Sequence, residues 1–94
     1  MIWTISMIEK ILLPFCTKHN IDEVILYGSR ARYTNRETSD VDLAVIGKDY
    51  TSFKNDVMRN ARTLLLFDIV DYNTASVSLK EEIDRHGRVL YRKE

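Results

Sequence analysis

Two aspartates separated by one residue, at the start of an apolar segment, constrain the fold of this chain more than any other feature. Residues 40–46 place Asp40 and Asp42 ahead of aliphatic residues, with the length and composition of a strand. Side chains alternate along a strand, so both carboxylates point to the same face of a sheet. Like charges held that close resist ionising together, and Mg²⁺ relieves the conflict because it favours carboxylate oxygens. The spacing therefore predicts a metal-binding carboxylate pair.

A Gly-Ser pair supplies a second motif upstream. Residues 24–27 form a short apolar run, and Gly28 and Ser29 follow it directly. We expect a helix to start at once, so that backbone N–H groups and the Ser29 hydroxyl face an anion. Glycine lets a phosphate approach the backbone. A phosphate site beside a carboxylate pair is typical of nucleotidyl or phosphoryl transfer, in which metal ions neutralise phosphate oxygens and activate the attacking oxygen.

Together the two motifs resemble the nucleotidyltransferase superfamily that includes DNA polymerase β, and within it the minimal nucleotidyltransferases (MNT). That family is marked by Gly-Ser followed, after a spacer, by Asp-x-Asp. Here the spacer is residues 30–39, and Asp40-Val41-Asp42 is flanked by Ser39 and Leu43, as is usual in the family. The resemblance extends over roughly residues 21–91. It implies a polymerase β-like nucleotidyltransferase fold.

A third acidic position lies in residues 64–73. Asp68 and Asp71 differ by three positions, so on a strand they face opposite sides and cannot both join the pair. An unpaired carboxylate between Phe67 and Ile69 would be costly to bury. In the family, the third acid precedes a short apolar pair and a further acid, and by resemblance that pattern selects Asp68. We expect Asp68 to be a metal ligand or general base, and Asp71 to be solvated or to cap the strand end.

Three arginines follow the Gly-Ser pair. Arg30, Arg32 and Arg36 are close in sequence, and such charge runs are usually solvated. Beside a phosphate site, however, arginine is well suited to contact phosphate oxygens, and we expect Arg30 to do so first. Tyr33 stands where the family often has glycine, a departure that bears on the substrate pocket and not on the metal site.

Size and composition predict a single domain over residues 1–94, with 45% hydrophobic residues to form a core. The 14 basic and 14 acidic residues balance, which argues against an extended nucleic-acid surface. Cys16, the sole cysteine, excludes an intramolecular disulfide and favours a cytoplasmic setting; we expect it in the core. No apolar run approaches the roughly 20 residues that span a bilayer, so we expect no membrane contact.

The remaining patterns predict an α/β fold, a small mixed sheet with helices packed on one side. Strands are expected near residues 23–28, 41–47, 66–72 and 88–92. Serine-to-glutamate capping boxes open the first and last helices at Ser6 and Ser78. Gly87 is expected to end the last helix as its C′ residue. In a middle helix over residues 51–62, four residues are expected to face inward: Phe53, Val57, Met58 and Ala61.

The resemblance implies a metal-dependent nucleotidyltransferase. In the implied reaction a hydroxyl attacks the α-phosphate of a nucleoside triphosphate, with ATP expected, and pyrophosphate leaves. Asp40 and Asp42 would hold two Mg²⁺ ions, with Mn²⁺ as the alternative metal. Asp68 would bind the ion that activates the acceptor, and Gly28 and Ser29 would hold the β- and γ-phosphates.

The resemblance also implies a partner. MNT proteins are commonly paired with a HEPN protein in toxin–antitoxin modules, where the MNT protein can transfer AMP to a tyrosine of the HEPN ribonuclease and silence it. That is the leading expectation here. The alternative is a noncatalytic antitoxin that neutralises its partner by forming a complex. A reading in which the aspartates merely end strands does not account for two carboxylates beside an anion-binding turn. Short edge strands and an apolar N-terminus are compatible with a homo-oligomer.

Overall fold

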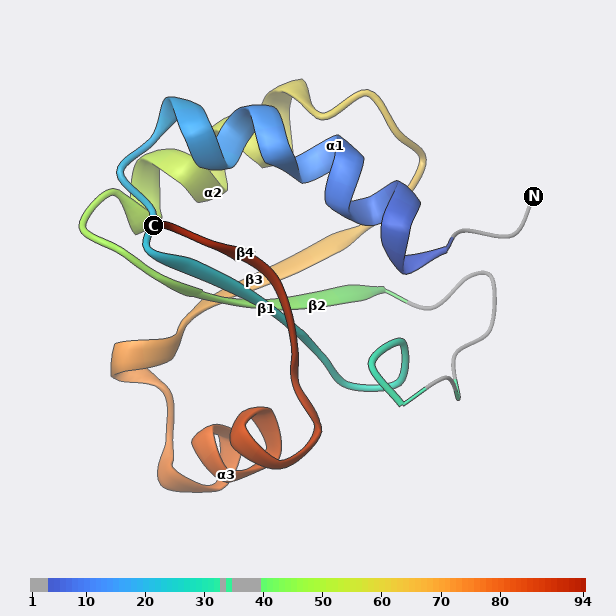
Figure 1. Ribbon diagram of the computed structural model, residues 1–94, viewed down its shortest axis with the longest axis vertical. Coiled ribbons are helices and arrows are strands. Elements are labelled where there is room, and N and C mark those ends of the chain that lie inside the picture. Colours follow the sequence, from blue (N-terminus) through green and yellow to red (C-terminus); the bar gives the residue numbers. More distant parts are fainter. Residues whose placement is uncertain (1–3, 33, 35–39) are drawn as a thin grey trace.

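A four-stranded sheet forms the centre of the computed structural model, which describes residues 4–32, 34 and 40–94 (Figure 1). The strands are β1 (Glu23–Tyr27), β2 (Val41–Ile46), β3 (Phe67–Asp71) and β4 (Arg88–Arg92). Their order across the sheet is β3-β2-β1-β4. β1 is antiparallel to β2 and β4, whereas β2 and β3 are parallel. The predicted α/β class with a small mixed sheet is confirmed.

Two helices, α1 (Ile5–Lys18) and α2 (Tyr50–Asn60), cover one face of this sheet (Figure 1). They enclose the larger apolar cluster, to which the strands contribute alternate residues because side chains alternate along a strand. Cys16 of α1 belongs to this cluster, as predicted, and burial raises the pKa of its thiol to about 12. No helix in the described part of the chain is long and apolar enough to cross a membrane. The central members of the cluster are Ile8, Leu12, Phe53, Val57, Val24, Leu26, Leu43 and Val45.

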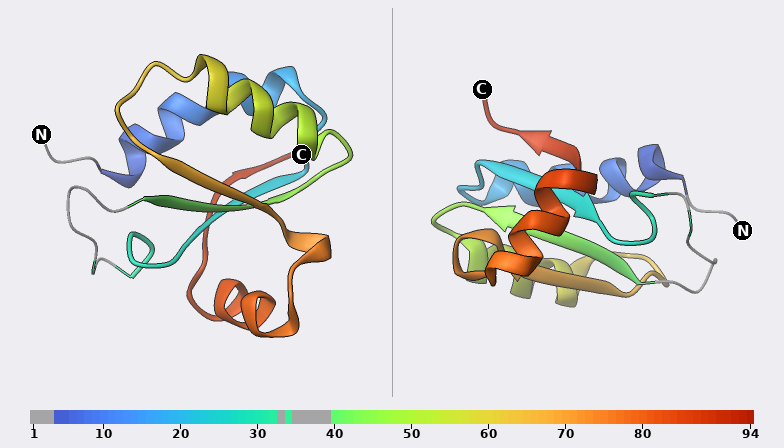
Figure 2. Two further views of the ribbon diagram at one scale, coloured as in Figure 1. Left: turned by 180° about the vertical axis from the view of Figure 1, so that it is seen from behind. Right: turned by 90° about the horizontal axis from the view of Figure 1, so that it is seen from below.

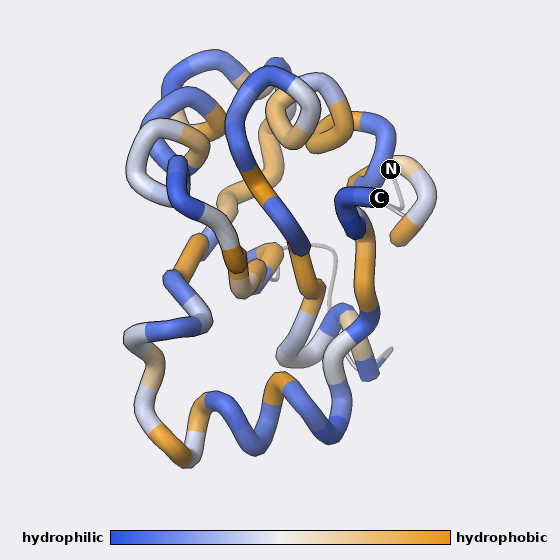
Figure 3. The backbone as a smooth tube through the Cα atoms, turned by 60° about the vertical axis from the view of Figure 1, so that its left-hand side comes forward, coloured by the Kyte–Doolittle hydropathy of each residue, from blue (hydrophilic) through white to orange (hydrophobic). Residues whose placement is uncertain are grey.

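The third helix, α3 (Val77–His86), lies on the opposite face, which corrects the expectation that the helices pack on one side only (Figure 2). The strands are apolar on both faces, so a second cluster forms where Ile83 of α3 meets Ile25 and Ala44. α3 is amphipathic: it is mostly hydrophilic, with hydrophobic positions about one turn apart (Figure 3). A short 3₁₀ helix, η1 (Tyr72–Thr74), connects β3 to α3.

The helix caps differ from the predicted ones by two positions. Thr4 caps α1 and Ser76 caps α3, and each side chain accepts the N–H of the third residue beyond it at 3.2 Å. The predicted caps, Ser6 and Ser78, lie inside the helices. A hydroxyl is available at both positions of each pair, so capping chemistry alone does not distinguish them.

Gly87 ends α3 as predicted, but not in the left-handed conformation of a C′ glycine, because its φ is −67°. Its lack of a side chain serves close packing instead. A Cβ atom at this position would lie 2.6 Å from Cγ2 of Ile25 and would also meet the carbonyl oxygen of Ile83. Glycine therefore lets the end of α3 approach β1.

The inward face of α2 is narrower than predicted. Phe53 and Val57 are buried and Ala61 packs against the cluster, but Met58 is 58% exposed. Residues four apart follow one line along a helix, and Met58 lies one position beyond that line. The expectation that Met58 faces the core is wrong.

Truncation of Phe53 and Met58 distinguishes the two faces of α2. Phe53→Ala should lower the free energy of unfolding by about 3–5 kcal/mol, because it removes a fully buried ring and leaves a cavity. Met58→Ala, the matched control on the same helix, should change it by about 0.5 kcal/mol or less. Urea unfolding measures both, and equal losses would contradict the burial of one side chain and the exposure of the other.

The end of α1 is tied to α2 through Asp56. His19 Nε2 lies 2.7 Å from Oδ2 of Asp56, Lys18 Nζ lies 3.1 Å from the same oxygen, and the Asn60 amide donates to Oδ1. These contacts, that of His19 foremost, lower the pKa of Asp56 from 3.8 to about 2. The ionised carboxylate therefore favours the folded state.

This depressed pKa predicts an acid dependence of stability. The contribution of Asp56 is complete above its ordinary pKa of 3.8 and is lost as the pH falls toward about 2. Asp56→Asn should therefore lower the Tm at neutral pH and flatten the decline of Tm across that acid range. Thermal unfolding followed by circular dichroism measures both, and an unchanged acid decline in Asp56→Asn would contradict the assignment.

Candidate active site

The parallel pairing of β2 with β3 brings two of the predicted site carboxylates together. Asp42 stands opposite Asp68 in the register of these strands, and it stands opposite Tyr27 of β1 on its other side. Ala44 and Val70, each two residues farther along, belong to the cluster beneath α3. Since side chains alternate, Asp42 and Asp68 share the face that α3 covers. That face, and not the main core, carries the candidate site.

The three predicted metal ligands differ in exposure. Asp42 lies in a central strand and is half-buried, whereas Asp68 on the edge strand is exposed. Asp40 lies one residue before β2 and is also exposed. Among the described residues, no three acidic, His or Cys side chains already form a metal cage. This donor set fits Mg²⁺, which is usually held by one or two carboxylates together with substrate phosphates and water.

Negative charge accumulates around Asp42. Its pKa is raised above 3.8, first by burial and then by the charges of Asp68, Asp40 and Glu82. Tyr27, which stands opposite Asp42 on the neighbouring strand, has its pKa raised to about 12, again first by burial and then by the charges of Asp42, Asp68 and Glu82. A bound cation would remove this repulsion, so the electrostatics favour a positively charged ligand at this point.

Gly28 brings the Gly-Ser turn against the carboxylates. Its φ is 75°, a left-handed conformation that glycine adopts at little cost. A Cβ atom at Gly28 would meet the Asp42 carboxylate, whose Cγ would lie only 3.3 Å away. The glycine is therefore required twice, by the backbone conformation and by the close approach of Asp42.

The helix that we expect directly after the Gly-Ser pair is not formed by residues 29–32, which make a single turn. The N–H of Arg32 donates to the Gly28 carbonyl at 3.3 Å, and the N–H of Thr34 donates to the Ser29 carbonyl at 2.9 Å. Thr34 Oγ1 donates to the same Ser29 oxygen at 3.3 Å. The turn nevertheless lies next to Asp42, as a phosphate site beside a metal site requires.

The arginines after the turn occupy different environments. Arg30 is buried, with 3% of its surface exposed. Its contact with phosphate stays a prediction. The Arg32 side chain is 45% exposed and pairs with Glu82 of α3, Nη1 to Oε1, at 3.8 Å. Arg36 lies outside the described residues, as do Tyr33 and Ser39.

Glu82 also lies at the candidate site, and the sequence did not indicate it. It raises the pKa of Asp42 and contacts Arg32, although it comes from the far end of the chain. One sequence feature could have indicated Glu82: its neighbour Ile83 is an apolar residue of a helix that packs on the sheet. Because all helices were expected on a single face of the sheet, this feature could not be connected with the site.

Comparison of the sequence with protein-family models identifies the family of this chain. The family model for polymerase beta nucleotidyltransferases matches residues 9–94. This chain belongs to the polymerase beta nucleotidyltransferase family. No curated protein is a significant match.

Solved structures share the fold of this chain. A candidate minimal nucleotidyltransferase is 24% identical, with a TM-score of 0.69 over 92% of this chain and 95% of that one. A chain from a toxin–antitoxin complex with AMP-PNP is 21% identical, with a TM-score of 0.69 over 92% of this chain and 74% of that one. A chain from the complex of a tri-AMPylated HEPN toxin of Shewanella oneidensis with an MNT antitoxin is 17% identical, with a TM-score of 0.67 over 96% and 74%. The predicted resemblance to the MNT proteins is confirmed.

Neutralising Asp42 tests the electrostatics of the site. Without metal, Asp42→Asn should raise the free energy of unfolding by roughly 0.5 kcal/mol, the scale of a like-charge pair opposed on neighbouring strands. Mg²⁺ should raise the Tm of the wild type, because ligand binding stabilises the folded state. It should have little effect on the Tm of Asp42→Asn, because this variant lacks one of the predicted metal ligands.

Asp71→Asn is the matched control for this measurement. Asp71 lies on β3 like Asp68 but on the opposite face, and its side chain accepts the N–H of Asn73, a contact that asparagine can retain. Thermal unfolding in EDTA and in MgCl₂ compares the three proteins. Equal Mg²⁺ shifts in the wild type and in Asp42→Asn would contradict a metal site at Asp42.

Proposed function

We propose that this protein is a metal-dependent nucleotidyltransferase that transfers AMP from ATP to a hydroxyl of a protein partner, a tyrosine of a HEPN toxin, and thereby acts as a cytoplasmic antitoxin. The observation that carries the proposal is the pairing of Asp42 with Asp68 beside the Gly28 turn. Membership of the nucleotidyltransferase family supports it. Related folds occur in toxin–antitoxin complexes, one of them with an AMPylated HEPN toxin.

In the proposed reaction, each site residue has a separate role. The turn at Gly28 and Ser29 binds the β- and γ-phosphates and orients the α-phosphate toward the carboxylates. Mg²⁺ held by Asp40, Asp42 and Asp68 would neutralise the phosphate oxygens and favour the ionised acceptor. The acceptor oxygen forms a bond to the α-phosphorus, the bond to the β-phosphate oxygen breaks, and pyrophosphate leaves. The exposure of Asp68 on the edge strand supports a role for this carboxylate in taking the acceptor proton.

The exposure of the site supports an acceptor on another molecule. Asp40 and Asp68 are exposed, and β3, which carries Asp68, is an edge strand. A macromolecular hydroxyl can approach such an edge without any opening of the fold. A partner tyrosine thus fits the site at least as well as a small alcohol.

A noncatalytic antitoxin is the second candidate, and one observation favours it. Met58, Leu64 and Leu66 are 58%, 97% and 69% exposed around the connection from α2 to β3. Exposed apolar residues that gather in this way offer a binding surface that needs no chemistry. The accumulated charge at Asp42 favours the catalytic candidate instead, because masking a toxin does not need it.

Transfer to the partner is the deciding measurement. The protein is incubated with labelled ATP and Mg²⁺, with and without a HEPN protein encoded beside it, and intact masses are recorded. We expect the HEPN protein to gain one or more AMP units. Asp42→Ala should reduce transfer by at least about 100-fold, because it removes a ligand of the metal that the transition state requires. Asp71→Asn should transfer normally.

A double variant separates the two candidates. Asp40→Ala with Asp42→Ala should still bind the HEPN protein but should no longer neutralise its toxicity in cells. If this variant binds and still neutralises, the protein acts as a noncatalytic antitoxin and the transfer proposal is wrong.

A further inference from the structure

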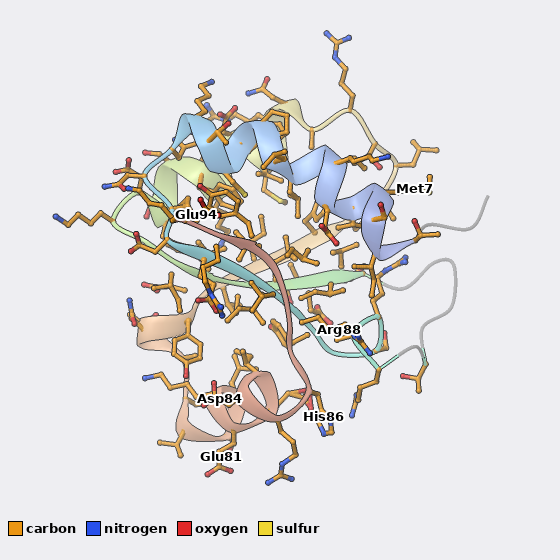
Figure 4. The ribbon with its side chains drawn as sticks, viewed as in Figure 1. Met7, Glu81, Asp84, His86, Arg88 and Glu94 are labelled. Atoms are coloured by element: carbon orange, nitrogen blue, oxygen red, sulfur yellow. The ribbon has the colours of Figure 1, made fainter. Side chains whose placement is uncertain are left out.

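The Gly-Ser turn is held from the far end of the chain. Nε of Arg88, the first residue of β4, donates a hydrogen bond to the carbonyl oxygen of Ala31 at 2.7 Å, in a partly buried position. Ala31 lies within the turn and is 2% exposed. Arg88 lies beside this turn in Figure 4. The contact spans 57 positions of sequence.

The backbone of Arg88 is itself fixed against β1. Arg88 stands opposite Leu26 in the register of β1 and β4. The preceding residue, Gly87, packs so closely on Ile25 that it leaves no room for a Cβ atom. Arg88 is thus anchored beside the end of the strand that leads into Gly28, and its side chain reaches on to the turn.

A weaker contact joins the same parts of the chain. Arg32, the last residue of the turn, pairs with Glu82 of α3 at 3.8 Å, and their side chains are 45% and 32% exposed. An ion pair that is this long and this exposed contributes little. The hydrogen bond from the charged Arg88 to a buried carbonyl is the stronger link, because charge-assisted hydrogen bonds exceed neutral ones.

The position of the turn relative to Asp42 matters for phosphate binding. Within the described residues, two backbone hydrogen bonds, from Arg32 and Thr34, close the turn. It follows Gly28, a residue with wide conformational freedom. A small shift of the turn relative to Asp42 would move its N–H groups away from the phosphates, and misplacement of about 1 Å is enough to impair such a site.

We propose that Arg88 is a positioning residue for nucleotide binding: it holds the turn of residues 28–32 at the distance from Asp42 at which a triphosphate can contact both. This inference rests on the proposed function, since it assigns the turn to the phosphates. The proposed role is exerted through the hydrogen bond from Arg88 to the Ala31 carbonyl.

Variants of Arg88 test this role in the whole protein with Mg²⁺, ATP and the HEPN partner. Arg88→Met keeps the aliphatic length and removes the donor. It should raise the KM for ATP about tenfold with kcat changed less than about twofold, as expected when one hydrogen bond that organises ground-state binding is lost. Arg88→Lys restores a charged donor and should recover part of the affinity.

Arg92→Met is the matched control. Arg92 lies on the same strand and also uses Nε, which is 3.3 Å from Glu23 Oε1, but its exposed side chain lies away from the turn. It should leave the KM unchanged. If Arg88→Met and Arg92→Met have the same KM as the wild type, the positioning role is wrong.

Amide hydrogen exchange gives a second readout that needs no nucleotide. Arg88→Met should speed exchange at the amides of Arg32 and Thr34 about tenfold, with the strands unaffected, because the turn opens locally. Unchanged exchange there, or faster exchange throughout the chain, would overturn the inference. A wild type that transfers no AMP would refute the proposed function, and the exchange rates would still decide whether Arg88 holds the turn.

Discussion

The parallel pairing of β2 with β3 is the constraint on which the candidate site depends. Its register places Asp42 opposite Asp68, and a slip of one residue would send one carboxylate to the other face. The register is fixed from that other face, where Val41, Leu43 and Val45 are buried beneath α1 and α2. Apolar packing on one face of the sheet therefore determines how close Asp42 and Asp68 lie on the opposite face.

The sheet also makes the two carboxylates unequal. Asp42 lies in an interior strand, with Tyr27 on one side and Asp68 on the other, so burial and neighbouring charge both act on it. Asp68 lies on an edge strand and faces solvent. Asp42 is thus held within the sheet at a point that favours a cation. Asp68 is accessible to a second molecule. A site that must bind a metal and admit a second substrate needs both properties.

Local patterns predicted the parts of this structure that are local in sequence. The four strands are short and rich in apolar residues, and their limits agree with the prediction to within a residue. That Asp42 and Asp68 belong to one site was predicted from the apolar residues that flank them and from the resemblance to the family. The face that α3 covers could not be predicted in this way. Strands that are apolar on both faces do not indicate which helix packs against which face. The Arg88–Ala31 contact has no local signal, since it depends on β4 returning beside β1.

Of the exposed apolar residues, Leu66 adjoins the candidate site, and this affects how the two candidate functions relate. The Leu66 carbonyl accepts the N–H of Val41, so the pairing of β2 and β3 continues one residue beyond β3. Leu66 and Asp68 are two residues apart along this extended segment and therefore lie on the same face. A partner that covers the exposed Leu66 would therefore also lie next to Asp68. Complex formation would then deliver the acceptor hydroxyl to the carboxylates, so that binding is a step toward transfer and not a substitute for it.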